Sequence, residues 1–141
     1  MTKLVLDSSV LVKWVTSNNE ELVKEARDIL RFTQKQKVKI FVPELTKFEV
    51  GNALWKKDIV YSEAAFDLEL FYHFPIEFVS WNKELAKRTL AIAIHEKITY
   101  YDASFIALAE DLKATLVTDN PKHQKKSLAS KIKVVALKEY K

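Results

Sequence analysis

Short runs of β-branched and aliphatic residues alternate with longer amphipathic segments along the whole chain of 141 residues. The runs predict strands at Lys3–Leu6, Val38–Val42, Ile76–Val79 and Ala114–Thr118, with a fifth candidate at Lys133–Leu137. Strands that alternate with helices of about 10–15 residues are typical of βαβ units, so we expect an α/β fold around a mainly parallel sheet. The chain contains no linker, repeat or low-complexity segment, so we expect residues 1–141 to form a single domain.

The segments between these runs carry start and stop signals of helices. We expect a short helix from Ser8 or Ser9 to about Val15 and a long helix capped by Asn18 or Asn19. A third helix has Pro43 in its first turn and continues through Trp55, and a fourth runs from Ser62 to near Pro75. Two further helices are predicted, one capped by Asn82 and one that Asp102 opens.

The scarcity of glycine and cysteine excludes several chemistries. Gly51 is the only glycine, and a loop that cradles phosphates needs several glycines close together. No cysteine is present, so disulfides, thiolate zinc sites and cysteine nucleophiles are excluded. The three histidines (His73, His95 and His123) are too dispersed for a local zinc motif of the HExxH type.

Composition indicates a globular protein with an apolar core. Hydrophobic residues make up 48% and charged residues 30% of the chain. No apolar run approaches the length of about 18 residues needed to span a bilayer, and the N-terminus does not resemble a secretory signal. We therefore expect a cytoplasmic protein that does not bind membranes. The net charge of +4 permits a polyanionic partner without requiring one.

Four acidic residues stand apart from the polar helix faces that carry the other acids. Asp7 and Asp119 directly follow predicted strands, Glu49 lies in the apolar stretch LTKFEVGNALW, and Asp102 begins a nearly uncharged helix. The carboxyl ends of parallel strands meet at one edge of a sheet, the usual place of binding and catalysis. Each acid also has a structural interpretation: Asp7 and Asp102 as helix caps, Glu49 as a peripheral residue, and Asp119 as part of a turn.

Four carboxylates at one edge would raise one another's pKa unless a cation were present. Oxygen ligands without nitrogen or sulfur suit the hard cations Mg²⁺ and Mn²⁺. Such an ion activates water and neutralises the charge of a phosphodiester during in-line attack. The acids therefore favour a metal-dependent hydrolase.

Four segments of the chain resemble, in order, the motifs of PIN-domain ribonucleases, especially toxins of the VapC type. They are LDSSVLVKW from Leu6, FEVGNAL from Phe48, TYYDASFIALA from Thr99 and ATLVTD from Ala114. The resemblance covers nearly the whole chain and implies a three-layer αβα domain with a central sheet of four to five strands. It implies an endoribonuclease in which water activated by Mg²⁺ or Mn²⁺ attacks RNA, without a protein nucleophile.

By this resemblance, the metal ligands and catalytic residues are Asp7, Glu49, Asp102 and Asp119. Ser8, Asn52 and Thr118 would orient water or the carboxylates. The family's last motif commonly has one residue between threonine and aspartate, whereas Asp119 follows Thr118 immediately and Asn120 stands at the expected acid position. Either Asp119 reaches the ion from a shifted turn or Asn120 supplies a neutral ligand.

Basic residues near these motifs are candidates for binding RNA phosphates. They are Lys13 and the run that contains Lys122, Lys125 and Lys126. A solvated helix face is the default explanation of the run, and the sequence does not identify the RNA. Six aromatic residues between Phe66 and Trp81 belong either to the core, which is the default, or to an interface. The resemblance implies a homodimer capped by a VapB-type antitoxin.

Two other functions remain open from the sequence. The shifted Asp119 permits a non-catalytic PIN-like module that binds RNA or protein. A PIN nuclease of RNA processing is a weaker alternative, because the chain has no accessory domain. A phosphate-accepting receiver domain is excluded, because no aspartate follows the central predicted strands.

Overall fold

Five strands form one parallel sheet in the computed structural model, which describes residues 1–15, 22–119 and 132–140. The strands are β1 (Thr2–Leu6), β2 (Val38–Pro43), β3 (Ile76–Val79), β4 (Thr115–Thr118) and β5 (Val134–Ala136). Their order is β3-β2-β1-β4-β5, so β1 is central. The register pairs Leu4 with Ile40 on one side and with Thr115 on the other.

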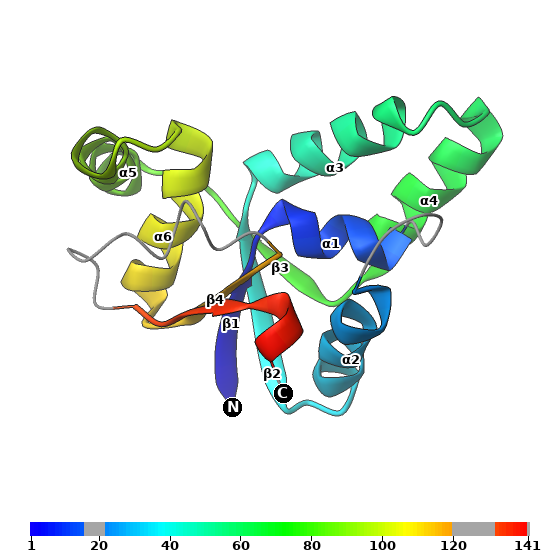
Figure 1. Ribbon diagram of the computed structural model, residues 1–141, viewed down its shortest axis with the longest axis horizontal. Helices are drawn as coiled ribbons and strands as arrows, with labels where there is room; N and C mark the ends of the chain where they lie inside the picture. The colour runs from blue at the N-terminus through cyan, green and yellow to red at the C-terminus, as the bar shows by residue number, and fades with distance from the viewer. Residues whose placement is uncertain (16–21, 120–131, 141) are drawn as a thin grey trace.

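Helices cover both faces of this sheet (Figure 1). They are α1 (Ser8–Val15), α2 (Val23–Gln34), α3 (Leu45–Lys56), α4 (Tyr61–His73), α5 (Lys83–Glu96) and α6 (Tyr100–Leu112), and a 3₁₀ turn, η2, covers Leu137–Glu139. Side chains alternate along β1: Leu4 and Leu6 pack with α1–α4, whereas Val5 packs with α5 and α6. This alternation creates a core on each face and produces the three-layer αβα architecture that the sequence predicts.

The strand predictions are confirmed, because an observed strand overlaps each of the five apolar runs. The cap at Asn82 is also confirmed, since its Oδ1 accepts a hydrogen bond from the backbone N–H of Leu85 (2.8 Å). The predicted caps Asn18 and Asn19 lie outside the described residues.

Two predicted helix starts are wrong. Pro43 is not in a first helical turn: it is the last residue of β2, in register with Val79, and α3 begins at Leu45. Asp102 does not open α6, because Thr99 is the N-cap and its hydroxyl accepts a hydrogen bond from the N–H of Asp102 (3.0 Å). Asp102 is instead in the first turn of α6, where a carboxylate is favoured by the helix dipole.

The aromatic segment between Phe66 and Trp81 is divided between core and surface. Phe71 is fully buried, whereas Phe66 is 65% and Tyr72 is 53% exposed. The default prediction of a core segment therefore holds for only part of it.

Among the described residues, none of the helices is both long enough and apolar enough to cross a membrane.

Candidate active site

Asp7 lies where the central strand β1 ends and is held there by its neighbours on β4. Its backbone N–H donates to the carbonyl of Val117 (3.0 Å). Its carboxylate oxygen Oδ2 accepts hydrogen bonds from the hydroxyls of Thr118 (2.8 Å) and Ser9 (3.2 Å). Burial raises the pKa of Asp7 above its ordinary value; the hydrogen bond from Thr118 opposes this increase, and the negative charge of Asp102 adds to it.

Glu49 reaches the same place from α3. The hydroxyl of Ser8 donates to Oε1 of Glu49 (2.6 Å) and orients the carboxylate. Burial raises the pKa of Glu49; the Ser8 hydrogen bond lowers it, and the charges of Asp7 and Asp102 raise it further. Asp7 at the end of β1, Glu49 on α3 and Asp102 on α6 therefore lie close enough for their charges to interact, as the sequence predicts.

Asp119 makes different contacts from Asp7 and Glu49. Its carboxylate forms an ion pair with Lys13 of α1 (Nζ to Oδ2, 3.3 Å), and its backbone N–H donates to the hydroxyl of Ser9 (3.2 Å). The side chain of Lys13 is only 3% exposed. Lys13, a candidate for binding RNA phosphates, is therefore covered in this structure and paired with an acid 106 positions away. Asn120, Lys122, Lys125 and Lys126 lie outside the described residues.

Ser9 is a site residue that the sequence analysis missed. It donates to Asp7 and accepts from the N–H of Asp119, so one hydroxyl connects the ends of β1 and β4. Its place two residues after Asp7, in the first turn of a helix, was the available signal. The link depends on the β1–β4 pairing, which spans over a hundred residues of sequence.

Two hollows meet at Glu49 and Asn52. One, of about 410 Å³, is also lined by Leu45, Phe48 and Tyr101. The other, of about 280 Å³, is also lined by Ser8, Ser9, Val12, Ala53 and Lys56. Phe48, Tyr101 and Lys56 were missed by the sequence analysis, although two of them directly precede the acids Glu49 and Asp102.

The donor chemistry of this site fits a hard divalent cation. All of its negatively charged ligand atoms are carboxylate oxygens. Burial, and to a smaller extent repulsion from neighbouring acids, raises the pKa values of Asp7 and Glu49, and a bound cation would favour their ionised forms. Within the described ranges, no three acidic or histidine side chains already converge into an ion-binding group. Mg²⁺ usually keeps several water ligands and binds only one or two carboxylates directly, so it does not require three carboxylates to converge.

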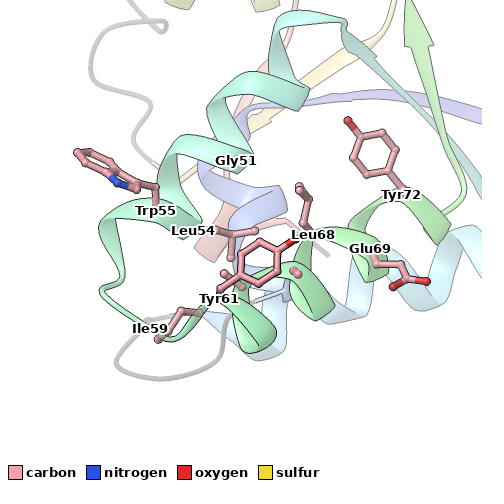
Figure 2. A pocket seen from close by; sticks show the side chains of 10 residues that line it. Gly51, Leu54, Trp55, Ile59, Tyr61, Leu68, Glu69 and Tyr72 are labelled. Carbon is pink, nitrogen blue, oxygen red and sulfur yellow. The ribbon is translucent and has the colours of Figure 1, made fainter.

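A larger apolar groove of about 620 Å³ lies between α3 and α4 (Figure 2). It is lined by Gly51, Leu54, Trp55, Ile59, Tyr61, Ala64, Ala65, Leu68, Glu69 and Tyr72. Gly51 is on the same helix as Glu49, two residues further along. A Cβ atom at Gly51 would meet no atom within 4 Å, so glycine leaves this wall of the groove open. The groove thus lies next to Glu49 along α3, and Asp7, Glu49, Asp102 and Asp119 are not among its lining residues.

Comparison with known proteins gives a consistent result. The family profile described as PIN domain matches residues 4–127. Ribonuclease VapC3 of Pyrobaculum aerophilum is 29% identical over 122 residues, which cover 82% of this chain and 88% of that protein. The structure of VapBC2 from Rickettsia felis bound to a promoter DNA fragment superimposes with a TM-score of 0.74 at 14% identity, covering 96% of this chain and 98% of that one. DNA-bound VapBC from Salmonella typhimurium gives a TM-score of 0.71 at 18% identity, with 97% and 99% coverage.

Proposed function

Because this chain belongs to the PIN domain family, we propose that it is an endoribonuclease that depends on Mg²⁺ or Mn²⁺ and acts as the toxin of a VapBC-type toxin–antitoxin pair. One observation carries the proposal: Asp7, Glu49 and Asp102 come from three separate elements, and their charges interact at the carboxyl edge of the sheet. The likeness to Ribonuclease VapC3 supports the reaction, and the likeness to VapBC complexes supports the partner. We propose that one domain covering residues 1–141 acts in the cytoplasm as a homodimer.

In this proposal, hydroxyl groups orient the carboxylates of two of the acids. Thr118 and Ser9 fix the carboxylate of Asp7, and Ser8 fixes that of Glu49. Asp102 completes the set, and Lys13 and Ser9 hold Asp119. A bound divalent ion would neutralise phosphate charge and increase the acidity of water. The acids would hold the ion, Asn52 would orient water or the carboxylates, and water would supply the nucleophile.

A matched pair of substitutions on α6 tests the reaction. We expect Asp102→Asn to lower the rate of RNA cleavage by about a hundredfold or more, because it removes an ion ligand without changing side-chain size. Asp111→Asn is the control, since Asp111 is exposed in the last turn of the same helix. Cleavage of a fluorescent RNA is measured for both, with melting curves to confirm folding. Equal activity of the two variants would refute the assignment of Asp102.

For the antitoxin, we propose the α3–α4 groove as the docking surface (Figure 2). Its apolar lining suits an apolar segment of a partner. The groove shares α3 with the hollow of about 410 Å³ at the acidic site. Glu49 and Asn52 line that hollow, and Gly51 and Leu54 line the groove. Glu49 is within a helical turn of Gly51, so residues that follow a segment bound in the groove would lie close to Glu49 and block access to it.

Gly51 offers a direct test of this docking surface. Gly51→Leu is expected to weaken antitoxin binding by about tenfold or more, because the new side chain enters the groove while its Cβ meets no neighbour. Gly51→Ala is the control: it adds one methyl group and should stabilise α3 by about 0.5–1 kcal/mol. Affinity for the antitoxin of the adjacent gene is measured by calorimetry. If Gly51→Leu binds like Gly51→Ala, the antitoxin does not use this groove.

A further inference from the structure

Lys13 is a charged residue that is buried next to the acidic site. It lies in α1, whose sequence SSVLVKWV contains no acid, and its side chain is 3% exposed. Lysine is almost never buried to this extent unless an opposite charge accompanies it. Its Nζ lies 3.3 Å from Oδ2 of Asp119, at the end of β4. The ion pair with Asp119 therefore explains how the fold accommodates a covered ammonium group.

One face of α1 holds Asp119 by both its backbone and its side chain. The hydroxyl of Ser9 accepts a hydrogen bond from the N–H of Asp119 (3.2 Å), and Lys13 pairs with the carboxylate. Ser9 and Lys13 are four residues apart, so they share a face of the helix. Because α1 packs against both β1 and β4, this face is fixed relative to the ends of the two strands. The ion pair is thus part of the folded framework.

The other three acids of the site are held in a different way. Neutral hydroxyl groups orient the carboxylates of Asp7 and Glu49, and such donors do not cancel a negative charge. The charge of Asp102 acts on both of them. At Asp119, by contrast, a lysine already supplies a positive charge. The attraction for a divalent ion is therefore concentrated on Asp7, Glu49 and Asp102.

We propose that Lys13 takes the place of a second metal ion at Asp119. The site then binds one divalent ion, whose ligands are among the other three acids. This inference rests on the proposed nuclease function and specifies its metal stoichiometry. A second ion at Asp119 would have to displace a covered ammonium group, and breaking a buried ion pair is strongly destabilising. An ion that bound without displacing Lys13 would be repelled by it.

Titration of the full chain with Mn²⁺, followed by calorimetry, tests this inference without measuring activity. We expect the wild type to bind one Mn²⁺ per chain. Lys13→Met keeps the length of the side chain and removes its charge, so Asp119 becomes available and a second Mn²⁺ should bind. Lys56→Met is the matched control, because Lys56 is exposed and lines the hollow that Glu49 also lines. It removes the same charge near the acids and should still bind one Mn²⁺.

A charge-balanced double variant tests the role of Asp119 separately. Lys13→Met combined with Asp119→Asn removes both members of the ion pair and leaves the net charge unchanged. If the pair supplies no metal ligand, this variant should bind one Mn²⁺ with a Kd within about threefold of the wild type. Loss of a true metal ligand should instead weaken binding by about tenfold or more. Melting curves confirm that each variant is folded.

Three results would overturn the inference: a wild type that binds two Mn²⁺, a folded Lys13→Met that binds one as Lys56→Met does, or a folded double variant with about tenfold weaker binding. The wild-type stoichiometry decides even where a variant does not fold. Failure of the ion site in the proposed function looks different, because the wild type then binds no Mn²⁺ or Asp7→Asn binds it normally. Failure of this inference alone leaves Mn²⁺ binding and RNA cleavage dependent on Asp7.

Discussion

Replacing Asp7 with asparagine is expected to lower RNA cleavage by about a thousandfold or more while leaving the fold intact. Asp7 is the most constrained of the three acids, with two hydroxyl donors and a backbone bond to β4 fixing its position. Asparagine has the same size and can still accept from Thr118, but it lacks the charge that attracts a cation. Initial rates of RNA cleavage measure the loss of activity, and far-ultraviolet circular dichroism checks that the fold is intact.

The same substitution is expected to raise the stability of the metal-free protein at neutral pH. Because folding raises the pKa of Asp7, the folded chain binds a proton more tightly than the unfolded chain does. The ionised carboxylate therefore destabilises the fold, and the loss develops as pH rises from the ordinary aspartate pKa to the raised value. The melting temperature of Asp7→Asn should exceed that of the wild type at pH 7 and approach it in acid.

Exposed Asp111 again supplies the control, because Asp111→Asn should show no comparable pH-dependent gain. A lower melting temperature for Asp7→Asn at neutral pH would contradict the account. It would mean that the hydrogen bonds from Thr118 and Ser9 to the carboxylate outweigh the cost of burying its charge.

Divalent ions are expected to stabilise the wild-type chain strongly. A ligand that binds only the folded state adds about 2.7 kcal/mol to the free energy of unfolding at a hundredfold excess over its Kd. Mn²⁺ should therefore raise the melting temperature of the wild type, and EDTA should reverse the shift. The effect is large because the ion offsets the burial and the repulsion that raise the pKa values of Asp7 and Glu49.

The matched controls for this ion effect are Asp7→Asn and Asp111→Asn. The first should lose most of the Mn²⁺-induced shift, and the second should keep it. An equal shift in all three proteins would show that Mn²⁺ binds elsewhere, and no shift in the wild type would contradict an ion site at these acids.

The fold and three of the acids could be predicted because their signals are local. A run such as VKIFV is too apolar and too short for anything but a buried strand, and strand ends identify Asp7 without knowledge of its neighbours. The cap at Asn82 likewise depends on a hydrogen bond three residues away. The start of α6 was misplaced by two residues because Thr99 and Asp102 are both good caps, and only the backbone path decides between them.

The remaining features depend on contacts between distant segments. A lysine in a short helix is normally solvated, and the burial of Lys13 follows from its pairing with Asp119 across the β1–β4 junction. Exposure of Phe48 and Tyr101 runs against the usual expectation that aromatic residues fill the core. Gly51 first excluded phosphate-binding loops; the structure shows that it also keeps one wall of the α3–α4 groove open.

In this account, the cost of ionising the empty site and its attraction for a divalent ion have one physical origin. Burial and mutual repulsion make the ionised acids unfavourable, and the same field attracts a divalent ion. Ser8, Ser9 and Thr118 prevent the carboxylates from relaxing toward solvent by donating to them.

Cleavage of a single-stranded RNA by the purified wild-type chain, with its product ends identified, tests the central claim most directly. The account predicts cleavage in Mn²⁺, none in EDTA and recovery when Mn²⁺ is restored. Because water is the nucleophile, the new ends should carry no 2′,3′-cyclic phosphate, which attack by the RNA's own 2′-hydroxyl would leave. Undiminished cleavage in EDTA, or cyclic phosphate ends, would contradict it.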